Sequence, residues 1–188
     1  DDLGYTYLGN LEDIDNTPVK EELLKANLKK RGYTDDQIKT AISELVGKVN
    51  NQSDTLYQIN RSVYSLLRYG RQGAKDAHGH RQTVHYIDWD DIGKNDFFVA
   101  EEVSVLRFDK VTRKRPDVVL YINGIALGVF ELKSSHVSAG KGIRQLLQNQ
   151  KKENIMSFFS TSQLLFAGNE AQGLFYGTTE TKEKYFYQ

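Results

Sequence analysis

The chain has 188 residues, of which 39% are hydrophobic and 27% charged, as is typical of one globular domain with a sizeable core. Its 25 basic and 25 acidic residues give a net charge of zero, so it lacks the basic excess of a free-standing DNA-binding domain. The absence of cysteine excludes disulfides, thiol chemistry and cysteine-based zinc sites. No apolar run is long enough to span a bilayer and no signal peptide is expected, so the composition favours a cytoplasmic protein with no membrane partner.

Helical patterns dominate residues 1–70. A first helix is predicted to begin at Thr17 as its N-cap. Thr34 and Gln37 have the spacing of a capping box for a second helix, and a third helix is expected to begin near residues 53–54. The apolar residues expected to face inward on the second and third helices are Ile38, Ala41, Ile42, Leu45, Val46, Val49, Leu56, Ile59, Val63, Leu66 and Leu67.

Strands dominate residues 82–188, after a segment rich in glycine and charge that predicts a loop at residues 69–81. The strands are predicted at residues 84–89, 97–108, 118–122, 125–132, 163–167 and 174–177. The third and fourth of these are nearly continuous apolar runs, which are typical of strands buried on both faces. Residues 140–159 are predicted to form a helix. This order predicts an α/β fold, a central mixed sheet flanked by helices, in a single domain over residues 1–188.

Three charged residues lie at the ends of a predicted hairpin with an Asn123-Gly124 turn. Asp117 precedes the first strand, and Glu131 and Lys133 end the second, two residues apart and therefore on one face. A strict two-residue turn would pair Asp117 with Phe130 and put the Asp117 carboxylate on the opposite face. We therefore predict a one-residue offset, from a bulge or a three-residue turn, that brings Asp117 opposite Glu131.

Two carboxylates beside an amine suit a divalent cation and its chemistry. Asp117 and Glu131 supply hard oxygen ligands for Mg²⁺, and a bound metal ion polarises a phosphate and activates a water. Lys133 is then placed to orient that water or to stabilise charge on the phosphate. The simpler alternative is a salt bridge at the strand ends, because an acidic residue near a lysine is common.

Pro116-Asp117 followed by Glu131-Leu132-Lys133 resembles the PD-(D/E)xK nuclease signature. The sequence of residues 115–133 is more specific and resembles the nuclease domain of type I restriction endonuclease R subunits. The likeness covers nearly the whole chain, and its other matching segments are residues 60–61, 66–70, 87–89, 95–97, 142–145, 149–150, 163–165 and 176–178.

The resemblance implies a restriction-endonuclease-like fold and Mg²⁺-dependent cleavage of double-stranded DNA, with Mn²⁺ as a possible substitute. The implied metal ligands are Asp117, Glu131 and the backbone carbonyl of Leu132, and the implied catalytic residues are Asp117, Glu131, Lys133 and Gln145. Gln145 matches the glutamine of a Gln-x-x-x-Tyr motif in the family, whereas Asn149 stands at the tyrosine position.

The resemblance also implies partners. It implies a complex with methylation and specificity subunits, and ATP-driven motor domains that would follow Gln188. The chain has no Gly-x-x-x-x-Gly-Lys-Ser/Thr loop, so ATP binding is expected only in the full-length subunit. Family members often carry a further acidic ligand on a helix that would precede Tyr5, and Glu21 and Glu22 are candidate substitutes, although they also suit a helix start.

Several alternatives stay open. The chain could be a non-catalytic docking or coupling module, or a stand-alone PD-(D/E)xK repair nuclease, which the flanking likeness disfavours. Basic residues that could line one side of a DNA groove are Arg113, Lys114, Arg115, Lys141, Arg144, Lys151 and Lys152. His78 and His80 form a weak candidate zinc pair in a charged loop, and His136 is close enough in sequence to Lys133 to approach the site.

Overall fold

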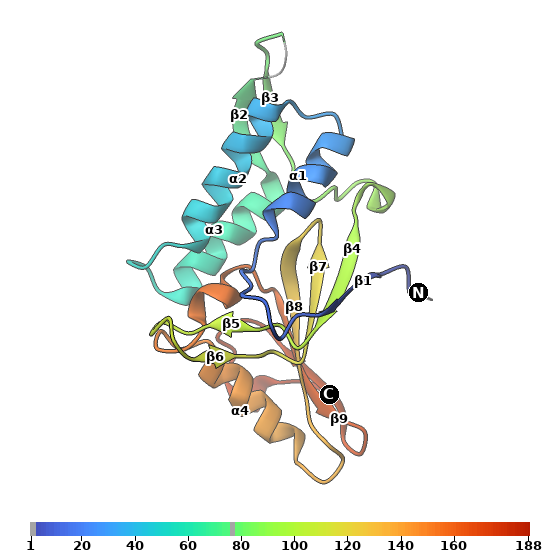
Figure 1. Cartoon of the computed structure of the whole chain (residues 1–188), viewed down its shortest axis with the longest axis vertical. Coiled ribbons are helices and arrows are strands. Elements are labelled where there is room, and N and C mark those ends of the chain that lie inside the picture. Colours follow the sequence, from blue (N-terminus) through green and yellow to red (C-terminus); the bar gives the residue numbers. More distant parts are fainter. Residues whose placement is uncertain (1–2, 76–77) are drawn as a thin grey trace.

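The computed structural model describes residues 3–75 and 78–188. Its framework is a six-stranded mixed sheet with the strand order β1-β4-β7-β8-β9-β10, flanked by helices (Figure 1). The strands are β1 (Thr6–Asn10), β4 (Phe97–Glu101), β7 (Val118–Ile122), β8 (Ile125–Leu132), β9 (Leu164–Asn169) and β10 (Gly173–Gly177). The β1–β4 and β8–β9 pairs are parallel, and the other three pairs are antiparallel. The predicted α/β class, with a central mixed sheet flanked by helices, is confirmed.

The predicted helical region forms a layer at one end of the sheet, at the top of Figure 1. It consists of α1 (Glu21–Lys30), α2 (Asp35–Val49), α3 (Leu56–Tyr69) and a hairpin of β2 (Arg71–Lys75) and β3 (Arg81–Val84). The inward residues predicted for α2 and α3 are buried apart from the partly buried Val46. Ile125 from the tip of the β7–β8 hairpin joins this core, so the helical layer holds the hairpin at its turn.

A second core lies between one face of the sheet and α4 (Ala139–Asn149). Ile143 and Leu146 of α4 pack there with Val119 of β7 and Val129 of β8. The predicted helix at residues 140–159 is too long, because the chain turns after Asn149 and resumes only as the short η2 helix (Met156–Ser160).

The opposite face of the sheet is less covered than the sequence predicted. Val118, Leu120 and Phe130 are only partly buried on that face. The exposed apolar side chains on the same face are Leu132, Leu164, Leu174 and Tyr176, each between 43 and 47% exposed. The prediction that β7 and β8 are buried on both faces is therefore wrong for this face among the described residues.

The helix starts differ from the predicted ones for a local reason. Residues 18–20 are extended, because the Ala126 N–H donates to the Pro18 carbonyl and the Lys20 N–H donates to the Gly124 carbonyl. Thr17 is therefore not an N-cap, and α1 begins at Glu21. The capping box of α2 is present as predicted, whereas α3 begins at Leu56 with Thr55 as its N-cap.

Several strands differ from those predicted. No strand is predicted at the position of β1, and β2 lies inside the predicted loop at residues 69–81. Of the strand predicted at residues 84–89, only Val84 belongs to a strand, as the last residue of β3. The predicted strand at residues 97–108 breaks at Glu102, whose φ of 50° takes it out of the extended region. The remaining elements are β5 (Val105–Leu106), β6 (Arg113–Lys114), η1 (Ile92–Lys94) and η3 (Glu183–Tyr185).

Among the described residues, no helix has the length and apolar character needed to cross a membrane.

Candidate active site

The β7–β8 hairpin contains the predicted one-residue offset. Its turn is a two-residue Asn123-Gly124 turn with φ of 53° and 83°, the left-handed pair that this tight turn requires. Gly124 also lies against α1, where a Cβ atom would come within 2.7 Å of the Lys20 carbonyl. The turn pairs Ile122 with Ile125, so the offset arises farther along the strands.

Leu127 is the bulged residue. Tyr121 pairs with Ala126, but Leu120 pairs with Gly128, so Leu127 has no partner on β7. Val118 then pairs with Phe130, which brings Asp117 opposite Glu131. The bulge thus places the two carboxylates side by side on the face that α4 covers.

Hydrogen bonds hold the charged groups at this end of the hairpin. The Leu132 backbone N–H donates to Asp117 Oδ2 at 2.5 Å, and the Lys133 ammonium donates to Glu131 Oε1 at 2.5 Å. Glu131 is completely buried, whereas the Lys133 side chain is 19% exposed and Asp117 is partly buried. The site therefore opens to solvent on the side of Asp117 and Lys133.

Gly142 of α4 permits the close approach that buries Glu131. A Cβ atom at residue 142 would lie 3.1 Å from the Glu131 carbonyl oxygen and 3.2 Å from Cβ of Ala167. A Cβ atom at position 142 would therefore crowd β8 and β9, and a branched side chain would push α4 away from β8. The glycine thus fixes the wall behind the Glu131 side chain.

Burial raises the pKa of the Glu131 carboxyl from 4.5 to about 7. The Lys133 hydrogen bond and charge lower this pKa, and the neighbouring Asp117 carboxylate raises it further. Glu131 Oε2 is buried and has no hydrogen-bond partner among the described residues. Lys133 therefore balances only part of the negative charge that Asp117 and Glu131 carry when both are ionised.

This donor set fits a hard divalent cation. A cation between the carboxylates would give Glu131 Oε2 a partner and would favour the ionised form of Glu131. No third His, Cys, Asp or Glu joins the pair in a metal-binding cluster within the described ranges. Two carboxylates nevertheless suffice for Mg²⁺, which keeps several waters and takes further oxygen ligands from a phosphate.

Gln145 and Asn149 lie farther along α4. Gln145 follows Gly142 by one helical turn and is partly buried, so it lies beyond Glu131 along the α4 wall. Asn149 is 1% exposed, and neither atom of its amide has a hydrogen-bond partner among the described residues. The role expected for Gln145 remains a prediction.

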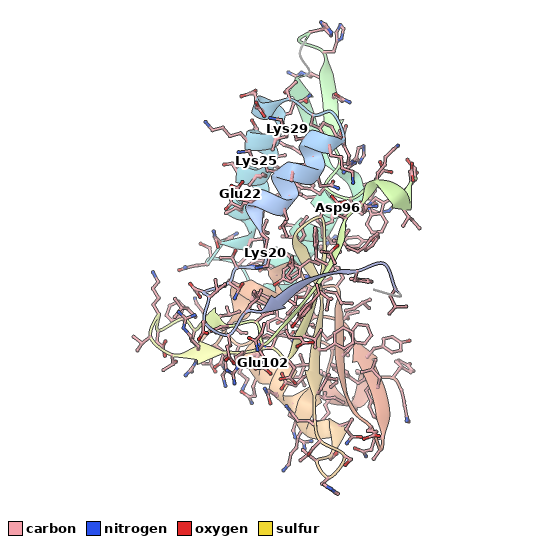
Figure 2. All side chains as sticks on the ribbon, turned by 45° about the vertical axis from the view of Figure 1, so that its right-hand side comes forward. Lys20, Glu22, Lys25, Lys29, Asp96 and Glu102 are labelled. Atoms are coloured by element: carbon pink, nitrogen blue, oxygen red, sulfur yellow. The ribbon has the colours of Figure 1, made fainter. Side chains whose placement is uncertain are left out.

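The candidate substitutes for a third acidic ligand lie elsewhere. Figure 2 shows Glu22 with Lys25 and Lys29 along α1, in the upper part of the molecule, whereas Glu102, which follows β4, lies lower in the same view. Glu21 and Glu22 line a hollow of about 830 Å³ between α1 and α2. They belong to the helical layer and do not join the Asp117 site.

Glu102 is a neighbour of the site that the sequence did not indicate. Its N–H donates to the Asp117 carbonyl at 2.9 Å, so it lies next to Asp117 across the sheet. Its carboxylate pairs with Arg115 Nε at 2.8 Å, and Arg115 also binds Glu12 at 3.0 Å. The pairing joins residues that are distant in sequence, so no local pattern could have revealed it.

The remaining candidates do not join the carboxylate pair. His136 is exposed in the turn after Lys133, and the rings of His78 and His80 lie 6.3 Å apart near the β2–β3 hairpin. Trp89, expected in a strand, lies in the connection before η1 and donates from Nε1 to the Leu67 carbonyl.

Comparisons with known proteins agree with the resemblance seen in the sequence. Residues 1–184 match the family described as "Type I restriction enzyme R protein N terminus". The chain is 23% identical over 198 residues to the putative type I restriction enzyme MjaIXP endonuclease subunit of Methanocaldococcus jannaschii, a match that covers 98% of the chain and 19% of that protein. It is 31% identical over 77 residues to the type I restriction enzyme HindI endonuclease subunit of Haemophilus influenzae, covering 40% of the chain and 7% of that protein.

The chain thus spans about a fifth of the length of the first of these relatives. The family match covers the two cores, the bulged hairpin and α4, and so includes every residue of the carboxylate site. The chain belongs to the family of type I restriction enzyme R protein N-terminal regions.

Proposed function

We propose that this domain is a Mg²⁺-dependent endonuclease that hydrolyses phosphodiester bonds of double-stranded DNA. The observation that carries the proposal is the Leu127 bulge, because it sets Asp117 opposite Glu131. A hairpin needs no such bulge for stability alone, whereas two convergent carboxylates need it to share one ligand. Both relatives described above are endonuclease subunits, which supports the same reaction class.

Asp117, Glu131 and the Leu132 carbonyl would hold the ion, and Mn²⁺ would substitute for Mg²⁺. When bound, the ion polarises the scissile phosphate and lowers the pKa of a water. Asp117 is fixed for this role by the Leu132 N–H, and Glu131 by the α4 wall. The ligand set is oriented before DNA arrives, so little ordering is needed at the moment of reaction.

Lys133 has two tasks in this proposal. Its ammonium group offers three donors, of which one reaches Glu131 Oε1. The others can orient the attacking water and bind a non-bridging phosphate oxygen, where negative charge develops. Attack of the water on phosphorus then forms one P–O bond and breaks another. Gln145, beyond Glu131 on α4, would position the phosphate or Lys133.

A nicking assay on supercoiled plasmid tests the proposal. It is run with the 188-residue chain at millimolar Mg²⁺ or Mn²⁺, and again with the domain in the complete R protein and its methylation and specificity subunits. Asp117→Ala and Lys133→Ala should each abolish cleavage, while Asp36→Ala, in the exposed first turn of α2, should leave it intact. Cleavage by the Asp117 and Lys133 variants at the unaltered rate would refute the assignment.

A non-catalytic docking role is the second candidate, and one observation favours it. The sheet face that α4 does not cover exposes Leu132, Leu164, Leu174 and Tyr176, a surface suited to packing against another domain. Titration with Mn²⁺ separates the two roles. Saturable binding that Asp117→Ala removes supports the nuclease, and no binding by the unaltered domain supports docking alone. In the complete enzyme, we propose that ATP-driven motor domains deliver DNA to this site in the cytoplasm.

A further inference from the structure

The β5–β6 hairpin forms one wall of a second hollow. The base of the hairpin is next to the candidate active site, because Lys114 at the end of β6 is three residues before Asp117. Near its tip, the Phe108 N–H donates to the Asn154 carbonyl at 3.0 Å, which ties the hairpin to the segment after α4 (Figure 1). The hollow between the hairpin, that segment and the end of α2 has a volume of about 430 Å³.

We call this hollow the hairpin pocket. Its charged lining residues are Arg107, Lys110 and Lys152, and no acidic residue in the described part of the chain lines it. Its amide side chains are Asn50, Asn51, Gln52 and Asn154. Phe108, a residue that is 58% exposed, supplies an aromatic ring. The pocket thus combines cations, amide donors and acceptors, and a free aromatic surface in one place.

The cations of the pocket are incompletely paired. Arg107 Nε is buried without a hydrogen-bond partner among the described residues. The nearby Asp109 lies 3.9 Å from Arg107, but its carboxylate accepts hydrogen bonds from the Val111 and Thr112 N–H groups and from the Thr112 hydroxyl. These bonds lower the pKa of Asp109 to about 2 and commit its charge to the turn. Asp109 therefore stays ionised and offsets part of the Arg107 charge. Lys110 and Lys152 form no ion pair within the described residues, so they supply the positive charge that remains available to an anion.

A neighbouring hollow shows the contrast. It shares Gln52, Lys152 and Met156 with the hairpin pocket. Three acidic residues also line it, namely Asp54, Glu153 and Glu180. Those carboxylates would repel a phosphate. An anionic ligand should therefore lie on the hairpin side of Lys152.

We propose that the hairpin pocket binds one nucleotide unit of a single nucleic acid strand. The base stacks on Phe108 and meets the amides of Asn50 and Gln52, and the phosphate lies between Lys110 and Lys152. The amide N–H groups of Asn51 and Asn154 already donate to Asp54 and to the Gln148 carbonyl. Stacking on aromatic rings above a basic groove is the general chemistry by which proteins hold unpaired strands. From Lys110 of the pocket to Asp117 is seven residues, or at most roughly 23 Å at ~3.3 Å per residue. A strand in the pocket is therefore within a few nucleotides of the carboxylate site.

The test measures binding of a fluorescein-labelled oligomer of 15 thymidylates to the 188-residue chain in EDTA, so that no metal site contributes. Phe108→Ala should weaken binding roughly five- to hundred-fold. The matched control is Tyr57→Ala, because Tyr57 on α3 is 59% exposed and lies outside the pocket. Lys110→Ala and Lys152→Ala should each lower the slope of log K against log salt by roughly 0.7. Lys25→Ala on α1 is their control.

Three further arms identify the ligand. Displacement of the oligomer by free thymidine monophosphate would assign the pocket to free nucleotides, and failure to displace it would assign the pocket to the strand. Equal binding of an oligomer without bases would overturn the proposal, as would unaltered binding by the Phe108 and lysine variants. Circular dichroism spectra and unfolding midpoints confirm that the variants are folded. Because no metal is present, failure of the cleavage assay leaves this result unaffected.

Discussion

Replacing Glu131 by glutamine should make the protein less sensitive to pH, since this buried carboxyl carries the largest electrostatic cost at the site. Glu131 is fully buried, and its Oε2 has no partner among the described residues. A rise of its pKa from 4.5 to about 7 corresponds to roughly 3 kcal/mol, at ~1.4 kcal/mol per pKa unit. Glutamine has nearly the same shape and keeps an oxygen for the Lys133 ammonium group.

The sign of the effect follows from the two protonation states. Below pH 4.5, Glu131 is protonated in the folded and the unfolded chain, and it has no effect on the pH dependence. Between pH 4.5 and about 7, only the folded chain keeps the proton, so the stability of the unaltered protein falls as pH rises. Above pH 7, the folded protein must bury the charge and the loss is complete.

Urea unfolding of both proteins in EDTA, at intervals from pH 4.5 to 8.5, measures this effect. The free energy of unfolding of Glu131→Gln, minus that of the unaltered protein, should increase across the range by up to roughly 3 kcal/mol. Glu153→Gln, which removes an exposed carboxylate in the segment after α4, is the control and should show no such trend. A difference that is constant from pH 4.5 to 8.5 would refute the reasoning.

Three further changes probe the elements that build the site. Deletion of Leu127 should remove the bulge and turn Asp117 to the other face of the sheet. Mn²⁺ binding in a calorimetric titration should then be abolished. Binding at the original affinity would contradict the inference that the bulge brings Asp117 opposite Glu131. Gly142→Val should force α4 away from β8 and lower the free energy of unfolding, measured in urea, by roughly 1–3 kcal/mol. The control is Gly140→Ala, where a Cβ atom would meet only ordinary contacts at 3.4 Å, and the free energy of unfolding should change little. Thr34→Ala should lower the free energy of unfolding by roughly 1 kcal/mol, because the α2 capping box is lost. It should leave Mn²⁺ affinity unchanged, so a loss of metal binding would contradict the separation of the helical layer from the carboxylate site.

Local chemistry explains why part of the fold was predictable. The helix α2 is defined by a capping box, Thr34 with Gln37, and by apolar residues at helical spacing, such as Ile38, Ala41 and Leu45. All of these interactions join residues close in sequence, so sequence patterns suffice to predict this helix. The wrong start of α1 has the opposite cause. Thr17 has the residue type of an N-cap, but pairing of residues 18–20 with the start of β8 outweighs that preference. Tertiary pairing of this kind has no local signature.

The candidate site divides in the same way. Asp117, Glu131 and Lys133 could be selected from the sequence, and the bulge could be inferred because the chemistry requires both carboxylates on one face. Its position at Leu127 could not, since many residues of an apolar strand can serve as a bulge. Glu102 was missed because its place beside Asp117 depends on strand pairing between distant segments.

The most direct test of the central claim is an anomalous scattering map from crystals of the domain soaked in Mn²⁺. The bulged hairpin predicts one strong peak between the carboxylates of Asp117 and Glu131, at roughly 2.0–2.4 Å from an oxygen of each. Crystals of Asp117→Ala should lack that peak. A manganese ion bound elsewhere, with Asp117 and Glu131 both free of metal at millimolar Mn²⁺, would contradict the account.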